Sequence, residues 1–185
     1  MPEAISILGF AGSLRKQSYN KAILRFAATR DFDDIKIDVF DLEGIPPFNQ
    51  DMENQPPDKV KAFKAKIRAA DAILIATPEY NYSIPGVLKN AIDWASRPSG
   101  DNSWGGKPVG VMGASIGTLG TARAQYHLRQ CFVSLNMHPL NKPEVMITIA
   151  QDKIDQEGNI TDAKTGEKIG AFVTALADWC KRLRG

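Results

Sequence analysis

The sequence predicts an α/β protein in which a five-stranded parallel sheet lies between two layers of helices. Apolar runs rich in β-branched residues alternate with longer segments of helical period along the 185 residues, which is the pattern of repeated βα units. Most of these runs are apolar throughout, as is typical of parallel strands covered on both faces. With 43% hydrophobic and 24% charged residues, the composition is that of a globular protein. We expect one domain spanning residues 1–185.

Five short apolar runs are the expected strands, because each combines β-branched residues with a length typical of a strand. They are residues 5–10, 35–40, 72–76, 109–113 and 145–149.

Helices are expected between and after these strands, since apolar residues recur there at spacings of three and four. The first helix is expected to begin near Tyr19 or Asn20. The later apolar stripes are Val60, Phe63, Ile67 and Ala70; Val87, Leu88, Ala91, Ile92 and Ala95; Ala124, Leu128, Cys131, Phe132 and Leu135; and Ile169, Phe172, Val173, Leu176, Cys180 and Leu183. Right-handed crossovers then place helices on both faces, and ligands bind at the carboxyl ends of the strands.

Charge and cysteine content exclude several classes of protein. Lys and Arg number 23 against 21 Asp and Glu, a net charge of +2, so neither a nucleic-acid binder nor a membrane protein is expected. The chain has no apolar run of membrane-spanning length, and the residues before the first strand lead us to expect no signal peptide. Cys131 and Cys180 are expected in the core of a protein from a reducing compartment, the cytoplasm. Two His and two Cys at unsuitable spacings predict no metal site.

The loop after the first strand has the composition of a phosphate site. Ser13, Ser18 and Asn20 supply neutral donors, and Arg15 supplies a forked cation. They precede a helix whose first amide N–H groups are free to bind an anion. Ser18 or Asn20 could instead simply cap that helix. Neither the dinucleotide fingerprint nor the Walker pattern is present, so a single terminal phosphate such as that of FMN is favoured.

Two further loops are expected at the same edge. Residues 77–86 contain two prolines that restrict the backbone, and Tyr80 and Tyr82 offer aromatic faces to a flat ring. Glycines at 113, 117 and 120 permit close approach of the backbone in the loop after the fourth strand.

Other functional classes fit less well. Residues 113–117 match the Gly-x-Ser-x-Gly motif of serine hydrolases, with Ser115 as nucleophile. However, no Asp or Glu lies between Ser115 and His127 or His138, so the ordered triad cannot be completed. A receiver-type signalling domain would need acidic residues at the end of the first strand, which ends in Gly9-Phe10-Ala11-Gly12-Ser13.

The three loops together resemble those of the NADPH-dependent FMN reductase family, which has a flavodoxin-like fold, and are most similar to its bacterial chromate and quinone reductases. The match is carried by residues 12–20, 78–94 and 113–120. The resemblance implies a flavodoxin-like sheet of order 2-1-3-4-5 and homodimers or homotetramers with the flavin near a subunit boundary. It also implies that FMN is bound by Ser13, Arg15, Ser18, Tyr19 and Asn20 at the phosphate and by Pro78, Glu79, Tyr80, Asn81, Ser115 and Gly117 around the ring. Residues 100–106 and 152–166 match no pattern.

We therefore expect an enzyme in which NADPH or NADH reduces bound FMN and a quinone, flavin or oxyanion then accepts the electrons. No side chain is nominated as a catalytic acid or base, because the cofactor carries the chemistry. A flavodoxin-type electron carrier is the alternative, although the balanced charge argues against it. The proline-rich connection of residues 42–57, with Phe48 and Met52, either covers a partner or site or packs on its own domain.

Overall fold

The parallel sheet and its strand order are confirmed by the computed structural model, which describes residues 4–185. The strands are β1 (Ile5–Ala11), β2 (Ile35–Phe40), β3 (Ala72–Ala76), β4 (Pro108–Ala114), β5 (His138–Pro139) and β6 (Val145–Ile147). Their order is β2-β1-β3-β4-β5, with β6 also paired to β4, and every pairing is parallel.

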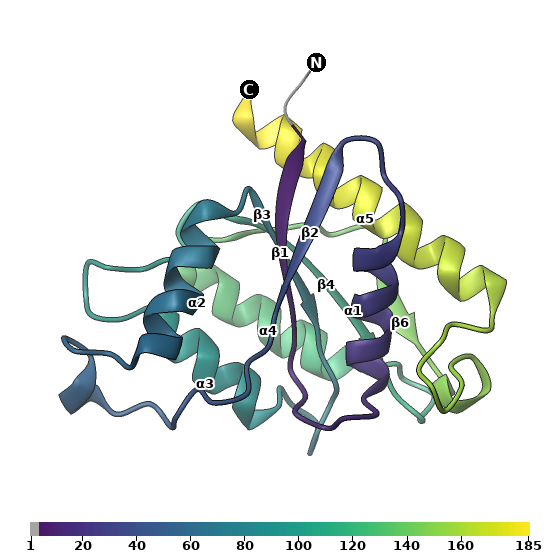
Figure 1. The fold of residues 1–185 in the computed structure, drawn as a ribbon, viewed down its shortest axis with the longest axis horizontal. Helices are drawn as coiled ribbons and strands as arrows, with labels where there is room; N and C mark the ends of the chain where they lie inside the picture. The colour runs from purple at the N-terminus through teal and green to yellow at the C-terminus, as the bar shows by residue number, and fades with distance from the viewer. Residues whose placement is uncertain (1–3) are drawn as a thin grey trace.

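Helices cover both faces of the sheet, as expected from right-handed crossovers. They are α1 (Tyr19–Thr29), α2 (Asp58–Ala69), α3 (Gly86–Ala95), α4 (Ala122–Leu135) and α5 (Ala163–Arg184), with short 3₁₀ turns η1 (Gln50–Met52) and η2 (Ala150–Asp152). Figure 1 shows α1 and α5 on one side of the strands and α2, α3 and α4 on the other. Each side has its own apolar cluster, one around α1 and α5 and one around α2, α3 and α4.

The fifth strand, predicted over residues 145–149, is shorter than expected, and a second short strand precedes it: residues 145–147 form β6, and residues 138–139 form β5, which was not predicted. β5 pairs with the start of β4, and β6 pairs with its end. Pro139 and Pro143 lack the N–H group that a continuous ladder needs, which interrupts the strand between them. The predicted end at Ile149 is also wrong: its φ is 51°, and its N–H donates to the carbonyl of Gly117 instead of to a strand.

The two cysteines lie in different environments. Cys180 is buried as predicted, whereas Cys131 is only half-buried, because it lies at the edge of the buried stripe of α4. Burial raises the pKa of both thiols above the ordinary value, so neither is an activated nucleophile. None of the helices in residues 4–185 is both long and apolar enough to cross a membrane. Residues 1–3, on which the signal-peptide prediction partly depends, lie outside the described part of the chain.

The proline-rich connection packs on its own domain. The carbonyl of Pro46 accepts hydrogen bonds from Asn90 Nδ2 and from Trp94 Nε1, both at 2.8 Å. The Phe48 N–H donates to Asn90 Oδ1 at 2.7 Å, and the Phe48 ring meets the Trp94 ring edge-on at 5.0 Å. The connection is therefore fixed against α3, which begins at the same sheet edge as the predicted site.

Candidate functional site

The loop after β1, residues 12–18, brings its hydroxyl groups to the start of α1 as predicted; we call it the phosphate loop. Ser13 and Ser18 are buried. Ser18 caps α1, with its hydroxyl accepting from the Lys21 N–H at 3.3 Å, and Ser13 accepts from the Arg15 N–H at 3.3 Å. Within residues 4–185, the backbone N–H groups of residues 16–20 donate to no protein acceptor. Consecutive free amides at a helix start form an anion site.

Arg15 is available to a ligand at this loop. Its side chain is exposed, and among the described residues it forms no ion pair with a carboxylate. The guanidinium carbon lies 5.8 Å from the centre of the half-buried Tyr19 ring. A cation that is not neutralised by the protein suits an incoming phosphate.

Asn20 occupies a different position from the one the phosphate prediction implies. Its Nδ2 donates to the Ala114 carbonyl at 2.9 Å, and its Oδ1 accepts from the Ala114 N–H at 2.9 Å. The side chain is buried. Its amide therefore joins the start of α1 to the end of β4, between the phosphate loop and the loop that follows β4.

The loop after β3 forms a two-residue hairpin that projects from the sheet edge. Tyr80 and Ser83 exchange backbone hydrogen bonds of 3.1 and 2.9 Å, while Asn81 and Tyr82 have φ values of 49° and 66°. Two consecutive positive φ angles are the geometry of a type I′ turn, which a tyrosine adopts only at an energetic cost. Pro78 is buried, and both tyrosine side chains are exposed at the tip of the hairpin.

Glu79 is held by the start of α4 and does not face solvent. Its carboxylate accepts from the N–H groups of Arg123 and Ala124 at 3.0 and 3.1 Å and from the Arg123 guanidinium. The guanidinium carbon of Arg123 also lies 3.6 Å from the centre of the Tyr82 ring. The Glu79 carboxylate raises the pKa of Arg123, which therefore stays charged. Sequence reasoning missed Arg123, since its partners lie more than 40 residues away in the chain.

The loop after β4 lines a hollow of about 340 Å³ beside this network, which we call the ring hollow. It is formed by residues 115–119 together with Glu79, Thr121 and Arg123. Within residues 4–185, the N–H groups of residues 116–121 have no protein acceptor. Gly113 is required by packing, because a Cβ there would lie 1.8 Å from Thr121 Oγ1 and 2.6 Å from the Thr77 carbonyl.

The serine hydrolase alternative finds no support in the site. Within residues 4–185, the single hydrogen-bond partner of Ser115 Oγ is the Gly117 carbonyl, at 3.5 Å. His127 Nδ1 lies 3.1 Å from Ser83 Oγ, and His138 begins β5. Packing explains the first glycine of the Gly-x-Ser-x-Gly match, since Gly113 has no room for a Cβ beside Thr121. The described residues also hold no cluster of three or more His, Cys, Asp or Glu suited to a metal ion.

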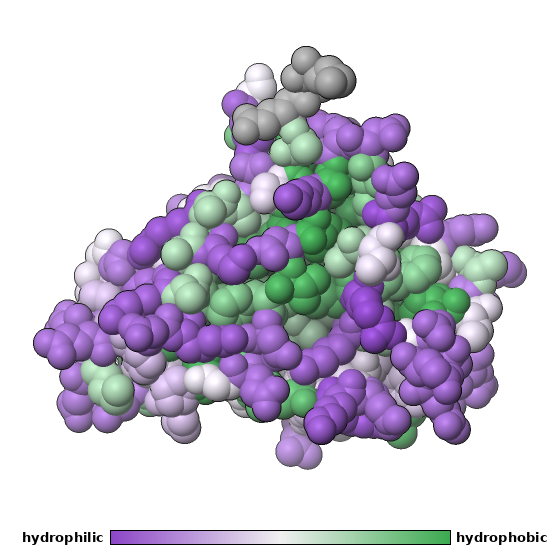
Figure 2. Space-filling view, in the orientation of Figure 1, coloured by the Kyte–Doolittle hydropathy of each residue, from purple (hydrophilic) through white to green (hydrophobic). Residues whose placement is uncertain are grey.

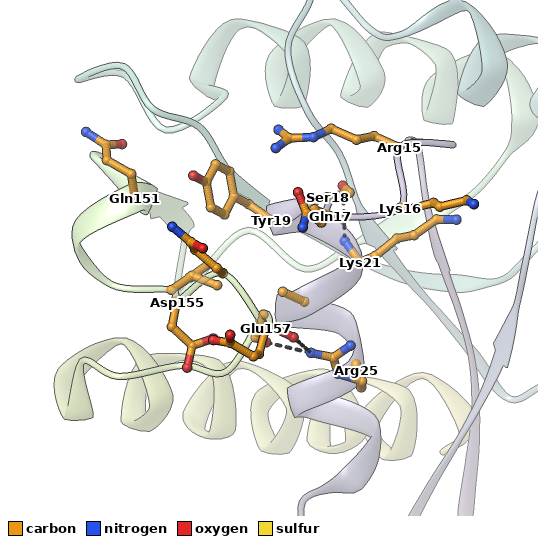
Figure 3. Close-up of a pocket in the computed structure, with 14 residues that line it drawn as sticks. Arg15, Lys16, Gln17, Ser18, Tyr19, Lys21, Arg25, Gln151, Asp155 and Glu157 are labelled. Atoms are coloured by element: carbon orange, nitrogen blue, oxygen red, sulfur yellow. Dashed lines mark hydrogen bonds between the residues drawn. The ribbon is translucent and has the colours of Figure 1, made fainter.

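A second cavity, which we call the outer cavity, lies on the other side of the phosphate loop (Figure 3). Its volume is about 300 Å³. One wall is formed by residues 15–19 and the next turns of α1, and the facing wall by Gln151 and residues 154–158. The second wall could not be predicted from the sequence, because residues 152–166 match no recognised pattern.

Comparisons with known proteins show the family and the fold of the chain. The sequence model of the NADPH-dependent FMN reductase family matches residues 5–152. The chain is 52% identical to an NAD(P)H-dependent FMN reductase of Pseudomonas aeruginosa, with all of both chains covered. It is 42% identical to a 2-hydroxy-1,4-benzoquinone reductase from a Burkholderia species, with 98% of this chain and 99% of that protein covered. Among solved structures, the flavoenzyme NAD(P)H:(acceptor) oxidoreductase of Paracoccus denitrificans matches at a TM-score of 0.88 and 35% identity, over 97% of this chain and 98% of that one.

Proposed function

The chain belongs to the NADPH-dependent FMN reductase family, and from this premise we propose that it is an FMN-dependent NAD(P)H oxidoreductase that reduces quinones, flavins or oxyanions such as chromate. The observation that carries the proposal is the phosphate loop. Its consecutive free amides, residues 16–20, and its two buried serines form a site that a single terminal phosphate fits.

The chain's residues fit FMN at both ends. The phosphate would be held by the hydroxyls of Ser13 and Ser18, by the free amides and by the exposed guanidinium of Arg15, and Tyr19 would form the adjoining wall. Asn20 holds the spacing between the two loops through Ala114.

The flat ring would be held by the hairpin and by the residues of the ring hollow. Pro78 and Glu79 fix the base of the hairpin, and Tyr80 and Asn81 form its tip. Ser115 and Gly117 line the hollow, where free backbone amides are available to the polar edge of a flavin. Arg123, bound to Glu79 and stacked on Tyr82, keeps this wall in one position and contributes a fixed positive charge.

When bound, FMN supplies the redox chemistry, which is acceptance of a hydride from NAD(P)H and delivery of the electrons to the acceptor. The chain binds and orients the reactants and leaves one face open between exposed Tyr80 and Tyr82. Because the reductant and the acceptor use the same open face, they bind in turn and the kinetics are ping-pong. No side chain acts as acid or base in this scheme.

The flavodoxin-type carrier remains the second candidate. A carrier that docks on basic redox partners is expected to be acidic, whereas this chain has a net charge of +2. The balanced charge favours an enzyme that takes a small-molecule acceptor. We further propose that it acts in the cytoplasm as a homodimer or homotetramer.

The visible spectrum of the purified protein, before and after addition of FMN, tests the proposal. Flavin bands that bleach on addition of NADPH under argon and return on addition of a quinone are the expected result. A colourless protein that leaves added FMN unbound would remove the premise. Bleaching by a reductase partner but not by NADPH or NADH would identify the carrier.

A further inference from the structure

One edge of the sheet is open at β2, which ends the strand order and pairs on one side only, with β1. The Ile5 N–H donates to the Asp34 carbonyl, and successive residues of a strand direct their backbone groups to opposite sides. Ile35, Ile37 and Val39 therefore direct their N–H and C=O groups away from β1. Within residues 4–185 these groups have no hydrogen-bond partner. Such an edge can accept a further strand.

The same edge carries apolar side chains on the face that α1 covers. Ile35 and Ile37 pack against the apolar cluster of α1 and α5, whereas Val39 is 47% exposed. A hollow of about 380 Å³ lies between Val39 and the α1 residues Leu24 and Ala28. Figure 2 shows hydrophobic surface near the centre of the view, in the region that Figure 1 gives to β1 and β2. An edge that is both unpaired and apolar is typical of an interaction surface.

The other face of β2 carries two opposite charges. Lys36 and Asp38 are exposed, and Asp38 forms an ion pair with Lys66 of α2. That pair lies on the surface, where ion pairs are weak, and 51% of the Asp38 side chain remains exposed. Lys36 forms no ion pair within residues 4–185. A strand that pairs with this edge therefore meets a free cation and, two residues further on, a carboxylate.

A second copy of β2 complements this edge in antiparallel orientation. With the twofold axis at Ile37, that residue meets its own counterpart, and Ile35 meets the partner's Val39. These residues have the outward N–H and C=O groups, so each such pair exchanges two backbone hydrogen bonds. Lys36 then lies opposite the partner's Asp38, in the kind of pair that brings side chains closest together. Because opposite residues share a face, the partner's Ile35 is directed to the hollow beside Val39.

We propose that β2 is an interface at which two copies of this chain join their sheets edge to edge, antiparallel and centred on Ile37. This goes beyond the proposed function, because the edge is separate from the hairpin and the ring hollow, which follow β3 and β4. An extended segment of another protein would satisfy the same backbone groups, but the alternation of Lys36 and Asp38 favours a second copy. Combined with association at the open face, a second symmetric interface gives a homotetramer.

Charge reversal followed by native mass spectrometry tests the proposal. Lys36→Asp places like charges opposite each other, so we expect the mass to fall by one step, from tetramer to dimer or from dimer to monomer. The dissociation constant of that step should rise at least about tenfold. Asp38→Lys should have the same effect. An equimolar mixture of the two variants should restore the parent mass with one copy of each in every pair, because their strands then present opposite charges at both positions.

Two further variants separate loss of the interface from loss of the fold. Ile37→Pro removes the outward N–H at the axis and leaves the ladder with β1 intact, so it should also lower the mass. Lys168→Asp makes the same charge change as Lys36→Asp on an exposed position of α5 and should leave the mass unchanged. The far-ultraviolet circular dichroism of every variant should match that of the parent.

A monomeric parent at micromolar concentration, an unchanged mass in Lys36→Asp and Asp38→Lys, or a mixture that stays dissociated would each overturn the β2 interface. Failure of the proposed function is a different result, because it appears as absent flavin bands and does not affect the mass measurement.

Discussion

The side chain of Asn20 takes the place of a neighbouring strand beside Ala114. β3 pairs with β4 only as far as Met112, so the N–H and C=O groups of Ala114 have no strand partner on that side. Asn20 bonds both groups at 2.9 Å, and β6 pairs with the other side of Ala114. One buried amide thus completes the sheet and sets the distance between the phosphate loop and the ring hollow.

Asn20→Ala should weaken both the fold and flavin binding. It leaves two buried backbone groups of Ala114 unpaired, which should lower the free energy of unfolding by about 2–4 kcal/mol. Because the loops lose their spacing, affinity for FMN and for riboflavin should fall by similar factors. Urea unfolding and flavin fluorescence quenching measure the two effects. Asn54→Ala, at an exposed position, is the control. A loss confined to FMN would show that Asn20 binds the phosphate directly.

Arg15→Ala, in contrast to Asn20→Ala, should weaken the binding of FMN but not the fold or the binding of riboflavin. The exposed guanidinium has no carboxylate partner in the described chain, so its removal should leave stability unchanged. A charge-assisted contact to a phosphate contributes about 1.5–3 kcal/mol, which corresponds to roughly ten- to a hundredfold in FMN affinity.

The comparison ligand is riboflavin, which has no phosphate and should bind Arg15→Ala almost as well as the parent protein. Arg182→Ala, in the exposed last turn of α5, controls for net charge. Unchanged FMN affinity in Arg15→Ala would remove Arg15 from the phosphate site.

The fold was predictable because its signals are local. The apolar runs that became β1 to β4 are continuous in sequence, and the parallel pairing follows from the helices between them. The edge strand was predicted less well, since the two-residue β5 precedes Pro143 and lies outside the apolar run of residues 145–149, of which only residues 145–147 form β6. The exposed Val39 in β2 likewise reflects the open edge of the sheet, where Figure 2 shows hydrophobic surface near the centre of the view.

The sequence likewise predicted those parts of the candidate site whose residues are close together in the chain. Ser13 and Ser18 lie within one loop, so hydroxyl composition and a helix start suffice to find them. The roles of Asn20 and Glu79 depend on partners 94 and 44 residues away. The sequence around such a side chain looks the same whether the side chain binds a ligand or the protein's own backbone. Only the structure therefore distinguishes ligand binding from a structural role.

Ser115→Ala should leave NAD(P)H oxidation within a few-fold of the parent rate. Among the described residues, the hydroxyl hydrogen-bonds only to the Gly117 carbonyl and has no histidine partner, so its loss removes at most one weak hydrogen bond near the ring. Reductase and ester-hydrolysis assays on the variant, with the exposed Ser134→Ala as control, measure this. Parent esterase activity that Ser115→Ala lowers by several orders of magnitude would assign the protein to the hydrolases.

The native protein should be a homodimer or homotetramer. Apolar side chains are exposed around the open face, including Tyr80, Tyr82, Ile116 and Leu119, and a flat ring at the edge of one small domain is poorly covered without a partner. Phe48 contributes less than the sequence suggested, because it packs on Trp94. Light scattering on the flavin-bound protein measures the mass, and a fully active monomer at micromolar concentration would disprove the prediction.

Steady-state kinetics should be ping-pong. The described residues provide one ring hollow, bounded by the hairpin and by residues 115–119, so the nicotinamide and a quinone cannot both lie against the flavin. The reductant must leave before the acceptor binds. Double-reciprocal plots against NADPH at several benzoquinone concentrations should therefore give parallel lines, and high quinone should inhibit competitively with NADPH. Lines that intersect over a wide range of quinone concentration would require two reactants bound together, and so a second acceptor position outside the ring hollow.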